Sequence, residues 1–100
     1  MATRINYYIS AAKFNQDRTK AEKLNVRILW NGFDYIWDRV EVIECINKGY
    51  NFFLFHENDD KLTVGEKVRV TEIEGKTFLR IDKKNVHNDF LGEISEIEYL

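Results

Sequence analysis

The stretch WDRVEVIECINKG, residues 37–49, carries the most complete set of local folding signals in the chain. Asp38 stands three residues before Glu41, the spacing of a capping box at a helix start, with Asp in place of the usual Ser or Thr. Gly49 can adopt the left-handed conformation that ends a helix. These signals predict a helix over residues 39–48, with an apolar face formed by Val42, Ile43, Ile46 and Tyr50. A helix of about three turns is marginal alone in water, so it must pack on other elements.

Two strands are expected before this helix. Residues 5–14 show the alternation of a half-buried strand, with inward positions at Ile5, Tyr7, Ile9 and Ala11. Residues 24–30 alternate in the same way, with apolar side chains at Leu24, Val26, Ile28 and Trp30. The polar residues 15–20 suit a solvated loop, so the two strands are expected to form a hairpin. Asn31-Gly32 then ends the second strand, because this pair readily adopts the positive φ of a tight turn.

Three more strands are expected after the helix. Residues 51–56 read NFFLFH and are apolar on both faces, which is typical of a central strand. Residues 67–73 alternate until Ile73 breaks the parity, so we expect a bulge near Glu72. A turn then leads into a strand over residues 77–82.

The resulting order β-β-α-β-β-β predicts an α+β fold, with a mainly antiparallel sheet of about five strands packed on one short helix. Residues 1–100 are expected to form a single domain, because this length suits one hydrophobic core. The tail over residues 92–100 fits two interpretations. Ile94 and Ile97 share a helical face, whereas Ile97 and Tyr99 fit the alternation of an edge strand.

The composition narrows the class of protein. The chain is 44% hydrophobic and 14% aromatic, which excludes a disordered chain. No apolar run approaches the roughly 18–20 residues of a membrane span. Residues 1–8 lack the apolar stretch of a signal peptide, and the single cysteine, Cys45, cannot form an internal disulfide. The sequence therefore predicts a cytoplasmic protein.

The same residues argue against an enzyme. Nucleophilic catalysis needs Ser, Cys or Thr beside a base, and neither histidine lies close to Cys45 in the sequence. The chain has no glycine-rich phosphate loop, no His-Glu-x-x-His motif and no paired-cysteine metal site. We expect no enzymatic activity and no cofactor.

The densest run of possible metal ligands is His56-Glu57-Asn58-Asp59-Asp60. Oxygen donors at alternate positions can bind a hard cation such as Ca²⁺. The run lacks, however, the spaced glycine and the distal glutamate of a calcium-binding loop. Asp and Asn also suit a tight connection between strands. Residues 58–60 are therefore predicted to form a turn, and no metal site is expected.

Several motifs occur in a fixed order along the chain: YYISA at residues 7–11, WDRVEVI at 37–43, FLRID at 78–82 and DFL at 89–91. Together they resemble a family of small prokaryotic domains called domain of unknown function 3892, over residues 5–94. Ile81 stands where that family usually has threonine, and Phe90 where it has asparagine. The resemblance implies the architecture given above, and the family has no established activity to transfer.

Arg80, Asp82 and Asp89 form a polar set of particular interest. If Arg80 shares a strand face with Asp82, its planar guanidinium can bind either carboxylate through two hydrogen bonds. One interpretation is a structural clamp that ties the loop over residues 83–88 to the sheet. The alternative is a binding site for an anion or a peptide carboxylate, centred on Arg80.

Basic side chains gather on the first hairpin: Lys13, Arg18, Lys20, Lys23 and Arg27. Tyr8 and Phe14 are expected on one face of its first strand. Basic groups interleaved with exposed aromatic rings bind single-stranded nucleic acid by charge and stacking. The net charge of −2 argues against a protein dedicated to nucleic acid. Single-stranded nucleic-acid binding is the alternative function.

The chain holds fourteen aromatic residues, of which seven lie within residues 33–55: Phe33, Tyr35, Trp37, Tyr50, Phe52, Phe53 and Phe55. One interpretation is that they fill a thin core between sheet and helix. The other is an interface, because aromatic residues are enriched at interface centres and an edge strand offers unpaired backbone to a partner. We predict that the protein acts by binding another protein or itself, as a homodimer, with Tyr35 and Trp37 as candidate interface residues. No membrane partner is expected.

Overall fold

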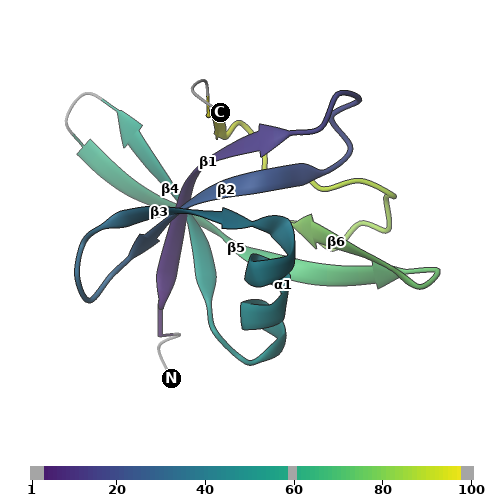
Figure 1. Ribbon diagram of the computed structural model, residues 1–100, viewed down its shortest axis with the longest axis horizontal. Coiled ribbons are helices and arrows are strands. Elements are labelled where there is room, and N and C mark those ends of the chain that lie inside the picture. Colours follow the sequence, from purple (N-terminus) through teal and green to yellow (C-terminus); the bar gives the residue numbers. More distant parts are fainter. Residues whose placement is uncertain (1–3, 59–60, 98–100) are drawn as a thin grey trace.

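The computed structural model describes residues 4–58 and 61–97. Its elements follow the order β1 (Tyr7–Phe14), β2 (Ala21–Ile28), β3 (Asp34–Asp38), α1 (Arg39–Asn47), β4 (Phe52–Asn58), β5 (Lys61–Ile73), β6 (Lys76–Arg80) and β7 (Ser95–Glu96). The predicted α+β class is confirmed, with the sheet as its larger part (Figure 1). The described residues contain more strands than the five predicted, because β3 and β7 join the sheet.

The strands form a mixed sheet in the order β3-β2-β1-β4-β5-β6, and β7 also pairs with β1. Neighbouring strands are antiparallel except at two places, since β1 runs parallel to both β4 and β7. A parallel pair needs a long connection. Here β2, β3 and α1 supply the connection from β1 to β4, and Figure 1 shows the helix below β2 and across β5.

The helix begins at Arg39 as predicted and ends at Asn47, one residue before the predicted end. Asp38 is the N-cap of α1, and Gly49, with φ of 101°, ends it in the left-handed region. The predicted capping box is wrong, however, because the Asp38 side chain makes no capping hydrogen bond. It forms an ion pair with Lys23 of β2 instead. The cross-strand pairing of β2 and β3 therefore draws the carboxylate away from the helix end.

The strand β3, directly before the helix, was not predicted from the sequence pattern. β2 ends at Ile28, and the chain turns with Gly32 at φ of 73°, as Asn31-Gly32 predicts. Trp30, expected in the preceding strand, lies within this turn. The chain then returns antiparallel to β2, so β2 and β3 form a second hairpin.

A bulge in β1 changes which of its side chains face the core. Ile9 pairs with Val26 and Ala11 pairs with Asn25, so Ser10 is an extra residue on this strand. The buried residue after Ile9 is therefore Ala12, and the prediction of Ala11 as inward is wrong.

The same change of parity separates Tyr8 from Phe14, which were expected on one face. Tyr8 stacks on Phe55 with ring centroids 4.9 Å apart, whereas Phe14 packs against the hydrophobic core. The two rings do not form a shared stacking platform.

β4 is a central strand, as predicted, because it has a strand neighbour on each side. The prediction of a bulge near Glu72 is wrong, because Glu72 pairs with Thr77 in regular register. The irregularity lies instead between β4 and β5, where the pairing shifts between Phe53 and Phe55. Of the turn predicted over residues 58–60, Asn58 ends β4, and Asp59 and Asp60 lie outside the described residues.

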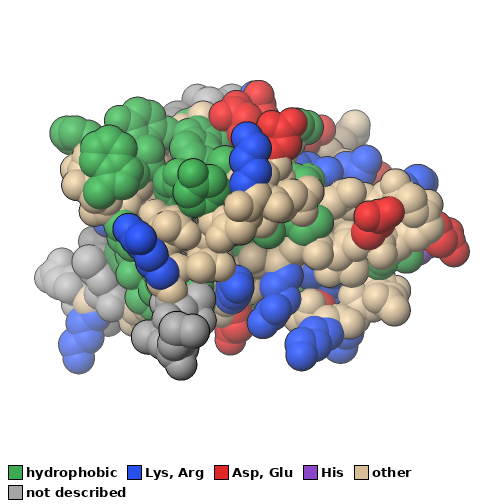
Figure 2. Space-filling view, turned by 90° about the horizontal axis from the view of Figure 1, so that it is seen from below, with side chains coloured by type: hydrophobic (Ala, Val, Ile, Leu, Met, Phe, Trp, Pro, Cys, Tyr) green, Lys and Arg blue, Asp and Glu red, His purple; other side chains and the backbone are tan. Residues whose placement is uncertain are grey.

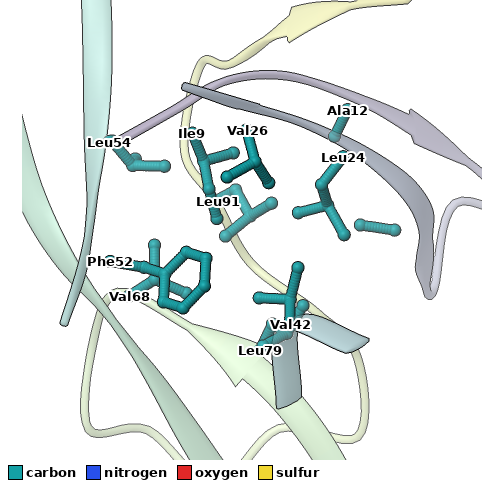
Figure 3. Close-up of a cluster of buried hydrophobic side chains, with 11 residues drawn as sticks. Ile9, Ala12, Leu24, Val26, Val42, Phe52, Leu54, Val68, Leu79 and Leu91 are labelled. Atoms are coloured by element: carbon teal, nitrogen blue, oxygen red, sulfur yellow. The ribbon is translucent and has the colours of Figure 1, made fainter. Parts of the chain in front are cut away.

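The core lies between the inner face of the sheet and α1, whose Val42 is fully buried (Figure 3). Leu91 inserts from the segment that precedes β7. The other fully buried members of the cluster come mainly from the strands: Ile9, Ala12, Ala21, Leu24, Val26, Phe52, Val68 and Leu79. The described part of the tail, which ends at Ile97, contains strand β7 and no helix. Tyr99 lies outside the described residues. No helix among the described residues is long and apolar enough to cross a membrane.

Candidate functional site

The β2–β3 hairpin exposes large apolar side chains, which we call the hairpin surface: Leu29, Trp30, Phe33, Tyr35 and Ile36. Trp30 is 82% exposed and Phe33 is 64% exposed. Figure 2 shows hydrophobic side chains gathered on the left of the molecule, the side on which this hairpin lies in Figure 1. Clustered apolar exposure of this kind is typical of interaction sites rather than of ordinary surface.

The turn that carries Trp30 is held by its own hydrogen bonds. The Gly32 N–H donates to the carbonyl of Ile28 over 2.8 Å, and the Ile28 N–H donates to the carbonyl of Phe33 over 3.0 Å. The Phe33 N–H donates to Oδ1 of Asn31 over 2.9 Å. The exposed rings therefore stand on an ordered turn, which lowers the conformational entropy lost when a partner binds.

Two ion pairs flank the hairpin surface and link β2 to β3. Arg27 binds Asp34 through two hydrogen bonds, Nε to Oδ1 at 2.7 Å and Nη2 to Oδ2 at 3.3 Å. The Arg27 guanidinium holds the pKa of Asp34 below its ordinary value, against the raising effect of partial burial. Lys23 forms an ion pair with Asp38. Both carboxylates of β3 are thus neutralised within the chain.

The structure separates the two aromatic residues that the sequence proposed for an interface. Tyr35 is 42% exposed and belongs to the hairpin surface. Trp37 is half-buried, and its ring lies 5.1 Å from that of Tyr7 and 6.2 Å from that of Phe52 between centroids. Trp37 therefore serves mainly to pack β3 onto the core. Trp30, which the sequence pattern had placed in a strand, is the most exposed ring of the hairpin.

Asp89 is bound by a residue that the sequence did not indicate. Its carboxylate is fully buried and accepts two hydrogen bonds from Arg39, Nε to Oδ2 and Nη2 to Oδ1, each at 2.9 Å. It also accepts the backbone N–H groups of Ala21 and Leu79, each at 2.8 Å. Arg39 further donates to the carbonyl of Thr77. Asp89 thus joins β2, α1 and β6.

Arg80 is 3% exposed and binds Asp82 as predicted, with Nε to Oδ1 at 2.7 Å and Nη2 to Oδ2 at 2.9 Å. Its Nη1 donates to the carbonyl and to the side-chain oxygen of Asn88 at 2.8 and 3.0 Å. The hydrogen bonds from Arg80 hold the pKa of Asp82 below its ordinary value. Arg80 and Asp89 do not pair with each other. Because each nitrogen of the Arg80 guanidinium already donates within the chain, the arrangement suits a clamp better than an anion site.

The basic residues of the first hairpin do not form a free positive surface. Arg18 pairs with Glu96 and lies over the ring of Phe14, 4.8 Å from its centroid. Lys23 and Arg27 pair with the carboxylates of β3 described above. Lys13 is half-buried on the strand and Lys20 is exposed at the loop end. The positive charge that this hairpin presents is therefore smaller than its sequence suggests.

A cleft of about 800 Å³ opens beside Arg27 and Asp34. It lies where β1 changes partner, since residues 7–9 pair with β4 and residues 11 and 12 pair with β7. Polar side chains line much of it: Ser10, His56, Glu66, Glu93 and Ser95. No buried polar side chain in the described part of the chain lacks a hydrogen-bond partner, so no buried unsatisfied group in the cleft indicates a ligand.

Within residues 4–58 and 61–97, no group of His, Cys, Asp and Glu side chains is arranged to hold a metal ion. Comparison with known proteins adds no relative, since no family model, curated protein or solved structure matches the chain. The resemblance to domain of unknown function 3892 therefore stays a prediction. The candidate site rests on geometry, and the hairpin surface is its best-defined part.

Proposed function

We propose that this protein is a non-enzymatic protein-interaction module that self-associates through the hairpin surface. The observation that carries the proposal is the exposure of Trp30 and Phe33 on an ordered turn beside the edge strand β3. Large aromatic side chains supply most of the binding energy at protein interfaces. Leaving two such rings in water is unfavourable unless a partner covers them.

A second copy fits this surface because the surface carries no net charge. Asp34 and Asp38 are each paired with a cation, Arg27 and Lys23, so neither copy brings a net charge of one sign to the contact. In a two-fold dimer the same patch lies on both sides of the interface, so the patch must be complementary to itself. An apolar patch whose charged side chains are already paired within the chain meets this requirement.

The proposal is tested by measuring the mass of the full chain in solution by light scattering over a wide range of concentrations. We expect a concentration-dependent dimer. Replacing Trp30 and Phe33 together with Ser should weaken the dimer by at least about tenfold. Val86→Ser is the matched control, because Val86 is 45% exposed and lies outside the hairpin. A monomer at every concentration, or a double variant that associates as the wild type does, would overturn self-association.

Single-stranded nucleic-acid binding is the weaker alternative, because at least three of the five cations named for it are held in ion pairs: Arg18, Lys23 and Arg27. Such binding would fall steeply with added salt, whereas association through an apolar surface would not. Repeating the mass measurement at low and high salt, with and without a single-stranded oligonucleotide, therefore separates the two functions. We further propose that the protein acts in the cytoplasm, on the basis of its single cysteine.

A further inference from the structure

The backbone of β3 is open on the side away from β2. The Ile28 N–H bonds to the carbonyl of Phe33, and bonded and non-bonded pairs alternate along an antiparallel ladder. Tyr35 therefore bonds to β2, while the N–H and C=O groups of Asp34 and Ile36 point outward. Within the described residues, no strand pairing or loop hydrogen bond satisfies these outward groups, and β3 is the end of the sheet order. An open edge of this kind can accept a further strand.

Along residues 33–38, successive side chains point to opposite faces of the sheet. Phe33, Tyr35 and Trp37 share one face, on which Trp37 packs against the core. Asp34, Ile36 and Asp38 share the other face, on which the two carboxylates pair with β2. A strand added to β3 would therefore meet a row of aromatic rings on one face, and Ile36 between two ion-paired carboxylates on the other.

Charge decides how a second copy of β3 aligns in antiparallel pairing. An alignment centred on Ile36 sets Asp34 directly opposite Asp38 of the other copy, twice, which is unfavourable. An alignment centred on Tyr35 sets Asp34 opposite Ile36 and removes this repulsion. It also sets Phe33 opposite Trp37 and Tyr35 opposite its own counterpart, so the aromatic residues of both copies form one row.

We propose that two copies of this chain pair antiparallel through β3, with Tyr35 on the two-fold axis, and so form one continuous sheet across the dimer. The outward groups of Asp34 and Ile36 then form four hydrogen bonds between the copies. This inference rests on the proposed self-association and adds its geometry. Because Tyr35 bonds to its own β2, it meets its counterpart as a non-hydrogen-bonded pair, in which the two Cα atoms lie about 4.5 Å apart. That distance permits a disulfide bond.

Cysteine cross-linking tests the alignment in the full chain, with Cys45 replaced by Ala throughout. We expect Tyr35→Cys to form a reducible covalent dimer under mild oxidation in most of the protein. Ile36→Cys, the neighbouring matched variant, should cross-link at least about tenfold less, because its counterpart lies two residues along the partner strand, beyond the reach of a disulfide. Both positions are at least 36% exposed, so neither substitution is expected to unfold the chain.

The outcomes separate the alignment from self-association itself. Cross-linking at Ile36 but not at Tyr35 would overturn the alignment and favour the one centred on Ile36. A non-covalent dimer without cross-linking at either position would overturn strand pairing and leave association through the hairpin surface intact. A chain that is monomeric by light scattering would overturn the proposed function as well.

A proline substitution gives an independent test of the open edge. Ile36→Pro removes an N–H that points away from β2, so the pairing of β3 with β2 is kept while strand addition is blocked. We expect a folded monomer by circular dichroism and light scattering. Ile36→Val, the control, should remain a dimer. A proline variant that is folded and still dimeric would overturn pairing through this edge.

Discussion

Arg39 and Asp89 lie 50 residues apart in the sequence, yet their side chains form a paired hydrogen bond with both distances at 2.9 Å. Arg39 is the first residue of α1, and Asp89 lies in the segment between β6 and β7. The fully buried carboxylate also binds the backbone of Ala21 and Leu79. One carboxylate thus fixes the helix start, two strands and the returning chain.

Asp89→Asn should be strongly destabilising, because it leaves Arg39 without its counter-charge and places amide hydrogens against backbone N–H groups. Breaking a buried pair of this kind costs about 3–5 kcal/mol, and urea unfolding measures the loss. Glu96→Gln, which removes the exposed pair with Arg18, is the matched control and should cost less than about 1 kcal/mol. Equal losses in the two variants would contradict a structural role for Asp89.

Arg80→Lys distinguishes a clamp from an anion site. Lysine cannot keep the paired hydrogen bonds to Asp82 together with those to Asn88, so we expect a lower urea midpoint for unfolding, by about 1–3 kcal/mol in free energy. The mass of the dimer should not change. A variant with unchanged stability would contradict the clamp and favour a ligand-binding role.

Gly65→Ala should destabilise the fold through a steric effect. A Cβ atom at this position would lie 3.1 Å from Nε2 of His56 and 3.2 Å from Cβ of Leu54. The imidazole can move, but Cβ of Leu54 is fixed to the backbone of β4, so we expect a loss of about 1–3 kcal/mol in thermal or urea unfolding. Adding His56→Ala should restore only part of the loss. Full restoration would show that the imidazole alone causes the strain.

Two carboxylates should make the folded state sensitive to acid. Hydrogen bonds from Arg27 and Arg80 lower the pKa values of Asp34 and Asp82 in the folded chain. Their stabilising effect is fully present above the ordinary pKa of Asp, about 3.9, and is lost as the pH falls from there through the lowered folded values. The unfolding free energy should therefore fall more steeply below about pH 4 in the wild type than in Asp82→Asn. Parallel curves for the two proteins would contradict this account.

Cys45 should react slowly with thiol reagents. Burial raises the pKa of its thiol, with smaller raising effects from Glu41 and Glu44 and a lowering effect from Lys48. The thiolate is the reactive form, so alkylation near pH 8 should be slower in the native chain than in urea. An equal or faster native rate would contradict a half-buried, protonated thiol.

The helix was predictable because its signals are local. Asp38 and Gly49 bound α1 as the sequence indicates. β3 gave no such signal, because it spans only five residues and its conformation depends on pairing with β2. The bulge at Ser10 could not be predicted either, because it depends on the pairing of β1 with β2. This one extra residue reverses which face each later side chain of β1 points to.

The site was harder to predict than the fold. Arg80 ends β6 and Asp82 follows two residues later, so their pairing could be predicted from their spacing. The partner of Asp89 could not, because nothing in the sequence links it to Arg39. Trp30 was placed in a strand by simple alternation, whereas the turn that precedes Gly32 leaves its ring exposed.

The most direct test of the central claim is a dilution series of ¹H–¹⁵N nuclear magnetic resonance spectra of the full chain. If the protein self-associates through the hairpin surface, the indole N–H of Trp30 and the amides of Phe33, Tyr35 and Ile36 should shift with concentration. The amide of Leu79, at the buried carboxylate of Asp89, should not shift. Spectra that do not change with concentration, or changes confined to the basic residues of the first hairpin, would contradict the account.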